Sequence, residues 1–221
     1  MDSFEQILPL LEKFQSTSDF LKIQQKISRV DSADLFNRGG YNPLLEAWIL
    51  VRAAAALETK VCNVKIRLVP EREQFPDAEV LVNGRKYNFE ITEVMKPGRK
   101  RGEEYRQEKE MKESGIVGEP ELVGYRFEEG NRFGAKWISS GIKRKQDKRY
   151  GTRSNLVVYA NFPFYELDAA LIADEANSFR DEFDSIWLIH SNNFLQLFDS
   201  LEFGCTDLKW HPVDLERYLK D

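Results

Sequence analysis

The sequence has few of the residues that soft-metal sites and most nucleophilic catalysts require. It contains 2 cysteines and 2 histidines among 221 residues. Cys62 and Cys205 lie far apart without CxxC spacing, which predicts small buried thiols in a reducing compartment and no zinc site. His190 and His211 lack metal-spaced partners, so we interpret both as structural. With no Ser, Cys or His nucleophile arrangement and no Gly-rich phosphate loop, triad hydrolases and phosphate-loop nucleotide-binding proteins are excluded.

Long hydrophobic runs and excess positive charge are also missing. No segment approaches 18 apolar residues, and residues 1–14 are acidic and amphipathic rather than basic and then apolar. We therefore expect a soluble cytoplasmic protein without a membrane partner. The net charge is −5 at pH 7, which argues against a generically basic DNA-coating protein. Any nucleic-acid surface has to be local.

The length and composition fit one globular α/β domain with a helical appendage. Of the 221 residues, 42% are hydrophobic and 31% are charged, which suffices for a real core. Residues 3–15 and 18–30 show helical spacing of apolar side chains and predict an N-terminal helical pair. The domain organisation predicted is therefore an appendage over 1–40 and an α/β domain over 41–221.

The central stretch is residues 75–94, FPDAEVLVNGRKYNFEITEV, which predicts a β-hairpin. Its Asn-Gly pair tolerates the two positive φ angles of a two-residue type I′ turn. If the residues flanking this pair close the turn, Asp77 lies opposite Glu90. Opposed residues of an antiparallel pair project to the same face with Cβ atoms roughly 5 Å apart. The two carboxylates are thus expected side by side.

Alternation gives this hairpin one polar and one apolar face. The polar set is Asp77, Glu79, Lys86, Asn88, Glu90 and Thr92. The face predicted to pack on the core carries Ala78, Val80, Val82, Tyr87, Phe89 and Ile91. Opposed like charges destabilise a sheet, and a hard cation such as Mg²⁺ relieves them through carboxylate ligands. The alternative interpretation, the solvated face of an edge hairpin, stays open.

Pro76-Asp77, the hairpin, and Glu90-Ile91-Thr92 after an apolar strand resemble the core motif of the PD-(D/E)XK nuclease superfamily. The resemblance implies the restriction-endonuclease-like fold, a mixed central sheet flanked by helices. It further implies that Asp77 and Glu90 bind Mg²⁺ or Mn²⁺, with the Ile91 carbonyl as a backbone ligand. The position of the family's catalytic lysine is occupied by Thr92 here, so a substitute must come from elsewhere.

A second acid candidate lies in the helix predicted over residues 42–59. This helix starts with Asn-Pro, is apolar almost all round, and carries an isolated Glu46. Glu46 is either a first-turn acid favoured by the helix dipole or a residue that points toward Asp77 and Glu90. Helices before the core hairpin of the nuclease family often supply such an acid, so the resemblance implies Glu46 as a metal ligand.

A helix predicted over residues 135–150 supplies the candidate lysine. At 100° per residue, Ile138, Ile142, Lys145 and Arg149 share one stripe. Lysine is rarely buried without a partner, so Lys145 is our substitute for the missing strand lysine. The alternative is that Lys145 packs its stem at the edge of the stripe and keeps its ammonium in water.

Two basic segments are candidate phosphate contacts. One follows the hairpin directly, and the other lies in residues 143–153, where six basic residues stand against one acid. The residues predicted to bind nucleic acid are Arg99, Lys100, Arg101, Lys143, Lys148 and Arg149. Solvated loop or helix surface is the alternative interpretation.

The C-terminal part predicts alternating strands and helices. Strands are expected over 155–162, 185–190 and 194–198, and helices over 167–183 and 212–219. This order of elements is what the nuclease core would show.

The function predicted through the resemblance is a Mg²⁺-dependent phosphodiesterase, an endonuclease acting on nucleic acid, with DNA expected. Asp77, Glu90 and Lys145 would be catalytic, and a homodimer is a common arrangement for the fold. The alternative is a catalytically inactive nuclease-like fold that binds nucleic acid or protein. Thr92 and the acidic net charge favour this alternative.

Overall fold

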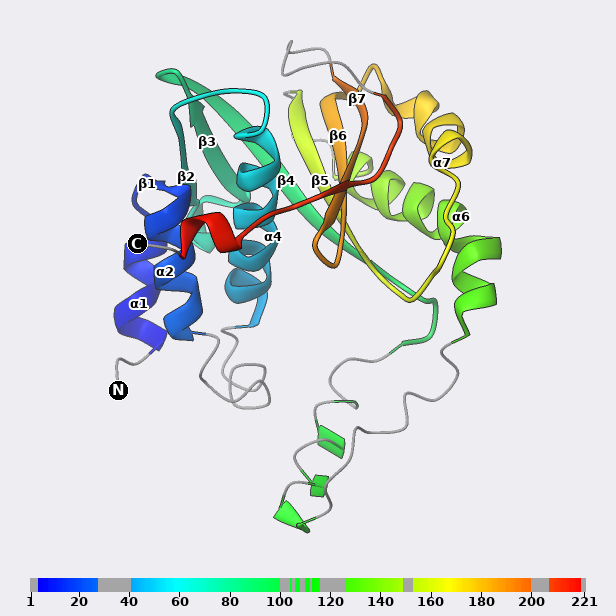
Figure 1. Cartoon of the computed structure of the whole chain (residues 1–221), viewed down its shortest axis with the longest axis horizontal. Coiled ribbons are helices and arrows are strands. Elements are labelled where there is room, and N and C mark those ends of the chain that lie inside the picture. The colour runs from blue at the N-terminus through cyan, green and yellow to red at the C-terminus, as the bar shows by residue number, and fades with distance from the viewer. Residues whose placement is uncertain are drawn as a thin grey trace.

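A mixed β-sheet of eight strands runs through the centre of the described chain (Figure 1). The computed structural model describes residues 4–27, 41–99, 104, 106–107, 110–111, 113–115, 126–148, 153–199 and 207–219. The strands lie in the order of the chain, from β1 to β8. The pairs β4–β5 and β5–β6 are parallel, and the other neighbours are antiparallel. The coarse prediction of an α/β fold is confirmed.

The strands are β1 (Gln15–Ser16), β2 (Val64–Leu68), β3 (Ala78–Val82), β4 (Arg85–Met95), β5 (Ser154–Asn161), β6 (Phe183–His190), β7 (Asn193–Asp199) and β8 (His211–Pro212). The helices are α1 (Phe4–Leu11), α2 (Thr17–Ile27), α4 (Tyr41–Leu57), α6 (Phe127–Gln146) and α7 (Ala169–Ala176). Short 3₁₀ turns are η1 (Glu71–Glu73), η2 (Asn177–Phe179) and η3 (Glu216–Tyr218). None of the helices in these ranges has the length and hydropathy to cross a membrane.

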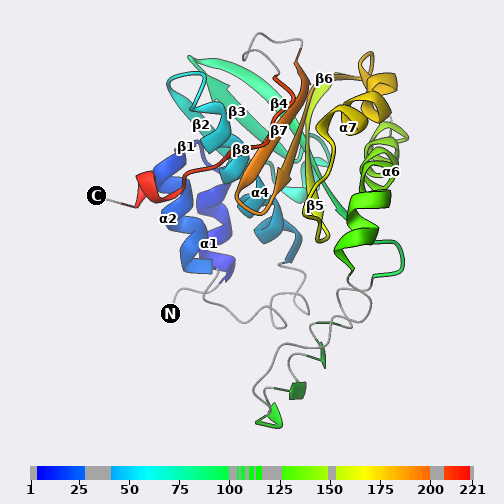
Figure 2. The same cartoon turned by 45° about the vertical axis from the view of Figure 1, so that its right-hand side comes forward.

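Helices cover both faces of the sheet, as Figures 1 and 2 show. One core joins α1, α2 and α4 to the face that carries Ile91 and Trp187. The other core joins α6 and α7 to the face that carries Val94 and Val158. Strands β4, β5 and β6 alternate their side chains between the two cores, which explains the largely apolar sequences of β5 and β6.

The hairpin forms with the predicted register. Val82 pairs with Arg85 and Glu79 with Asn88, around a turn in which Asn83 and Gly84 both have positive φ. The face predicted to be apolar packs in the first core beneath α4, which confirms that part of the prediction. The polar face is only partly solvated: Lys86 near the turn is exposed, whereas Glu90 is buried where α6 packs against β4.

Helix α6 is longer than the sequence indicated. It begins at Phe127 rather than near residue 135. Its first turns contain Gly130 and Gly134, and glycine in a sequence usually indicates a loop. A Cβ at Gly130 would lie 1.9 Å from the Pro163 carbonyl oxygen, and one at Gly141 would lie 2.3 Å from Val94 Cγ2. These glycines permit close packing, and the approach at Gly141 brings the last turn of α6 onto β4.

The remaining C-terminal elements follow the predicted order with different bounds. Strands β5, β6 and β7 lie within two residues of the expected ranges. The helix expected over 167–183 ends at Ala176 and continues only as η2, because Phe183 already begins β6. Of the short helix expected over 212–219, only the 3₁₀ helix η3 forms, while Pro212 belongs to β8.

The N-terminal helices share a core with the sheet. Ile7 and Leu11 of α1 and Phe20 and Leu21 of α2 are buried in the cluster that α4 builds. The predicted domain boundary at residue 40 lies outside the described residues, so the division into an appendage and a domain stays a prediction.

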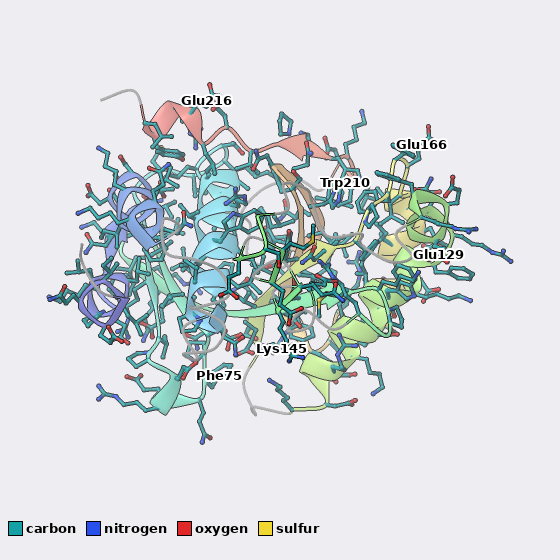
Figure 3. All side chains as sticks on the ribbon, turned by 90° about the horizontal axis from the view of Figure 1, so that it is seen from below. Phe75, Glu129, Lys145, Glu166, Trp210 and Glu216 are labelled. Atoms are coloured by element: carbon teal, nitrogen blue, oxygen red, sulfur yellow. The ribbon has the colours of Figure 1, made fainter. Side chains whose placement is uncertain are left out.

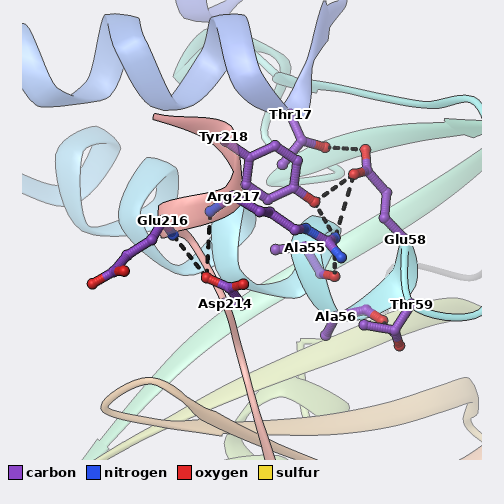
Figure 4. Close-up of polar contacts among 9 residues, drawn as sticks. All are labelled: Thr17, Ala55, Ala56, Glu58, Thr59, Asp214, Glu216, Arg217 and Tyr218. Carbon is purple, nitrogen blue, oxygen red and sulfur yellow. Dashed lines mark hydrogen bonds and ion pairs between the residues drawn. The ribbon is translucent and has the colours of Figure 1, made fainter. Parts of the chain in front are cut away.

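The C-terminal turn η3 is fastened to this helical layer through one carboxylate (Figure 4). Glu58, just after α4, accepts hydrogen bonds from Thr17 Oγ1 at 2.5 Å and from the Tyr218 hydroxyl. Arg217 donates to the Ala55 carbonyl at 3.0 Å and lies 3.6 Å from the Glu58 carboxylate. Three segments distant in sequence are thereby joined at one point.

Candidate functional site

Three charged side chains from three separate elements meet between α6 and the sheet. Asp77 precedes β3, Glu90 lies on β4, and Lys145 belongs to the last turn of α6, where Figure 3 labels it. Lys145 Nζ donates hydrogen bonds of 2.6 Å to Asp77 Oδ2 and of 2.6 Å to Glu90 Oε2. The exposed fractions of these side chains are 8% for Lys145, 19% for Asp77 and 1% for Glu90. We call these three residues the acid–lysine centre.

The hairpin fixes the two acids. Its ladder ends at the Ala78–Phe89 pair, so the next backbone N–H of β4 on that edge has no strand partner. The Asp77 side chain takes the partner's place, because its Oδ2 accepts the Ile91 N–H at 2.7 Å. Since the N–H and C=O of one residue point to the same edge of a strand, the Ile91 carbonyl faces this edge too.

Glu46 approaches from the opposite helical layer. It lies near the start of α4 and is half-buried. Burial and then the charge of Asp77 raise the pKa of Glu46 to about 8, although Lys145 partly offsets them. Glu46 is therefore within electrostatic reach of the acid–lysine centre, with its carboxyl protonated over much of the neutral range.

The centre carries more acid than its lysine can balance. Burial and then the charge of Asp77 raise the pKa of Glu90 to about 7, although Lys145 opposes this shift. Burial alone would lower the pKa of Lys145, but the two carboxylates outweigh it and raise that pKa. The ammonium thus stays charged while Glu90 titrates near neutrality.

The excess of acidic over basic groups in the centre is most evident at one oxygen of Glu90. Glu90 Oε1 is buried and has no hydrogen-bond partner among the described residues. A buried carboxylate oxygen without a donor is costly, on the order of 1–3 kcal/mol or more. The oxygen is placed to accept a proton or to bind a cation.

Glu79, on the same face of the hairpin, gives the contrasting case. Arg67 contacts its carboxylate at 2.7 Å and Lys86 at 2.6 Å. Burial by itself would raise the pKa of Glu79, but these two cations outweigh it and lower the pKa. Glu79 is fully paired, so we place it outside the centre.

The side chains of the centre form a small donor set for a metal ion. Within the described ranges, no group of three or more His, Cys, Asp or Glu side chains is placed so that it could hold a metal ion. Mg²⁺, however, is commonly held by one or two carboxylates, with waters and substrate oxygens filling its other positions. Asp77, Glu90 with its unpaired oxygen, and the Ile91 carbonyl meet that smaller requirement.

The residues predicted to contact nucleic acid are only partly described. Lys100, Arg101 and Arg149 lie outside the described residues. Arg99 is held within the chain, because it contacts the Glu104 carboxylate at 2.7 Å and the Asn161 carbonyl at 2.9 Å.

Two further residues of that set, Lys143 and Lys148, lie at the C-terminal end of α6, before and after Lys145. Lys143 is exposed and pairs with Asp147 at 2.8 Å. Lys148 is exposed near the centre, and its charge lowers the pKa of Glu90.

Glu93 is a half-buried acid that was not predicted from the sequence. It lies on the opposite face of β4 from Glu90, accepts a hydrogen bond of 2.5 Å from Asn161 Nδ2, and has a pKa raised by burial. Its position on the face shared with Phe89 and Ile91 was the available signal. Thr92, at the position of the family's lysine, is half-buried on the Glu90 face.

No protein-family model matches the chain, and no curated protein matches it significantly. A search of solved structures finds a protein of unknown function from Pseudomonas aeruginosa strain PAO1, described under the monooxygenase superfamily. The sequences are 15% identical, the match covers 97% of each chain, and the TM-score is 0.36. A likeness this weak gives the present chain neither a family nor a function.

These findings correct the predicted family. No family model and no curated protein matches the chain, and the solved structure that was found is not described as a nuclease. The predicted endonuclease and its inactive nuclease-like alternative are withdrawn with it. The motif is short and Thr92 interrupts it, and the facing acids of any charged hairpin satisfy the rest. The spacing therefore located a cluster of charges without specifying a family.

Proposed function

We propose that Asp77 and Glu90 of the acid–lysine centre bind a divalent cation, Mg²⁺ or Mn²⁺, and that Glu46 donates or accepts a proton beside it. The observation that carries the proposal is the buried Glu90 oxygen, which has no hydrogen-bond donor among the described residues and lies next to a second carboxylate. Buried carboxylates held together at a cost in stability are typical of functional sites.

Lys145 holds the position that the cation would take. Its ammonium is shared by Asp77 Oδ2 and Glu90 Oε2 at equal distances, as a bridging ion would be. The flexible stem of a lysine allows the ammonium to turn outward along α6, toward the exposed Lys148, whose charge already acts on Glu90. There, the two lysines would favour an anionic substrate.

When bound, the cation would lower the pKa of a water or polarise a substrate oxygen. The residues that would hold it are Asp77, Glu90 and the Ile91 carbonyl. Glu46 has a pKa of about 8 and so releases or accepts a proton near neutral pH, as a general acid or base must. Lys145 would donate a hydrogen bond to the anionic group of the substrate.

The test is isothermal titration calorimetry of the intact protein with MgCl₂ and MnCl₂. The double variant Asp77→Asn/Glu90→Gln removes the two ligands and is nearly isosteric. The matched control is Asp181→Asn/Glu182→Gln, which changes the same charges at two exposed positions. Far-ultraviolet circular dichroism and thermal melting confirm that each variant is folded.

We expect saturable binding by the natural protein and by the control, and a loss of affinity of at least about tenfold in the ligand variant. Equal affinity in all three proteins, or no saturable binding in the natural protein at millimolar metal, would overturn the proposal.

A further inference from the structure

A second candidate site lies at the other end of α6 from the acid–lysine centre. A groove with a volume of about 720 Å³ is lined by Phe164, Tyr165, Glu166, Asp168, His190 and Trp210, among others. It lies where β5 and β6 end, and ligands of open α/β sheets commonly bind outside the carboxyl ends of parallel strands. Its volume is within the range of small-molecule sites.

The groove is separate from the centre. The loop that forms it packs on Gly130, fifteen residues before Lys145 on the same helix. At 1.5 Å per residue, the separation along the helix is roughly 22 Å. Figure 3 shows Glu166 and Trp210 well apart from Lys145.

The aromatic lining is held in place before any ligand binds. Asn131 Oδ1 accepts hydrogen bonds from the backbone N–H groups of Tyr165 at 3.0 Å and Glu166 at 3.3 Å. Phe164 stacks on His190 with ring centroids 3.9 Å apart, and Trp210 lies 5.8 Å from Phe164. Such preorganisation lowers the entropic cost of binding.

One ring of the lining remains largely in solvent. The Tyr165 side chain is 74% exposed, while its ring stacks on Phe127 with centroids 3.9 Å apart and planes at 10°. Because Phe127 covers one face and fixes the plane of the ring, the Tyr165 ring is presented in a set orientation at the groove.

The charge of the groove is negative. Glu166 and Asp168 line it, and no lysine or arginine is among the described residues that do so. Burial lowers the pKa of His190, so this imidazole adds no positive charge at neutral pH. Asp168 already accepts the Ala170 and Leu171 N–H groups as the cap of α7, which leaves no free helix terminus for an anion. The complementary ligand is a cation.

We infer that this groove binds a small alkylated ammonium cation, with the choline head group as the simplest example. Aromatic rings attract such cations through their negative faces, and the alkyl groups match the apolar lining. A primary ammonium is more strongly hydrated and would lose more free energy on leaving water. The Glu166 carboxylate adds direct charge attraction. This inference does not depend on the proposed cation site.

The experiment is a titration of the intact protein followed by the nuclear magnetic resonance signal of the Trp210 indole N–H. The probes are choline and its neutral isostere 3,3-dimethylbutan-1-ol, which has the same shape without the charge. The variants are Glu166→Gln, which removes the charge, and Trp210→Leu, followed by calorimetry, which removes the ring. Glu182→Gln is the control at an exposed acid outside the groove.

We expect choline to bind at least about tenfold more tightly than the neutral isostere, and each groove variant to lose at least about fivefold in affinity. The control should bind as the natural protein does. Equal binding of the two probes, unchanged affinity in Glu166→Gln, or no binding of choline would overturn the inference. If Trp210→Leu does not fold, the comparison of probes and Glu166→Gln still decides.

Discussion

Lys145 is the residue on which the electrostatic balance of the acid–lysine centre depends. The substitution Lys145→Met keeps the length of the stem but leaves Asp77 and Glu90 without their shared cation. We expect a loss of about 3–5 kcal/mol in the free energy of unfolding at pH 8, because an uncompensated buried charge remains. The loss should be smaller at pH 5, where Glu90 is protonated.

Urea denaturation at the two pH values measures this effect. Lys143→Met is the control, since Lys143 is exposed on the same helix and should change stability by less than about 0.5 kcal/mol. If Lys145→Met is as stable as the natural protein at pH 8, Lys145 does not balance the two acids.

The raised pKa of Glu46 predicts that the free energy of unfolding depends on pH. Its pKa is about 8 in the folded chain against an ordinary value of 4.5, so the folded state binds more protons between these values. The free energy of unfolding contributed by Glu46 is therefore fully present below about pH 4.5 and is lost as pH rises to about 8.

The difference in stability between the natural protein and Glu46→Gln isolates this term from other titrating groups. We expect the natural protein to lose about 2 kcal/mol relative to the variant between pH 5 and pH 8.5, after discounting for the partial exposure of Glu46. A difference that is constant with pH, or that changes in the opposite direction, would show that Glu46 is solvated.

At this scale, the sequence identified the members of the centre but not their energetics. Lys145 was found because a lysine on an apolar stripe needs a partner, and the structure places it against Asp77 and Glu90. Their catalytic roles stay predictions. The pKa values of Glu46 and Glu90 could not be predicted, because they depend on burial by elements distant in the sequence.

Among the elements, α6 determines how close the lysine comes to the sheet. Gly141→Ala would place a Cβ 2.3 Å from Val94 Cγ2, and the β-branched Val94 has little freedom to move. We expect a net destabilisation of about 1–3 kcal/mol despite the better helix propensity of alanine. Affinity for the divalent cation should also change, because Lys145 lies one turn further along α6.

Thermal and urea denaturation measure the stability, and calorimetry with Mn²⁺ measures the affinity. Ser140→Ala, at the neighbouring exposed position, is the control and should have little effect. A Gly141→Ala protein that is more stable than the natural one would show that α6 does not need this close approach.

A separate prediction concerns how the C-terminal turn η3 is held. Burial and then the Glu58 carboxylate raise the pKa of the Tyr218 hydroxyl well above its ordinary value, so it stays a donor (Figure 4). Tyr218→Phe removes that donor and should cost about 1–2 kcal/mol of stability. Urea denaturation measures the cost, with Tyr165→Phe at an exposed ring as the control. Equal stability of both variants would mean that η3 is not held through Glu58.

Elements with strong local signals were predictable. The Asn-Gly turn and the alternation of β3 and β4 predicted the register that the hairpin adopts. The start of α6 was not predicted because Gly130 and Gly134 lower the helix propensity of the segment. Glycine is required at these positions by tertiary packing, since Pro163 and Phe162 lie where Cβ atoms would be. Contacts of this kind leave no trace in local sequence.

For the whole molecule, the coarse α/β class followed from the order of elements, whereas the family did not. The nuclease assignment rested on one hairpin, and a local charge pattern cannot identify a family without support from the rest of the chain. The groove could not be predicted either, because its lining comes from three separate parts of the chain, around residues 164–168, 190–193 and 210.

The proposed function requires that a divalent cation binds between Asp77 and Glu90. The most direct measurement is a crystal structure of the protein soaked in MnCl₂, with anomalous diffraction used to locate the metal. We predict an anomalous peak within bonding distance of both carboxylates, with the Lys145 ammonium displaced from its present 2.6 Å contacts. If Lys145 still bridges the two acids and no peak lies beside them at millimolar Mn²⁺, the proposed cation site is contradicted.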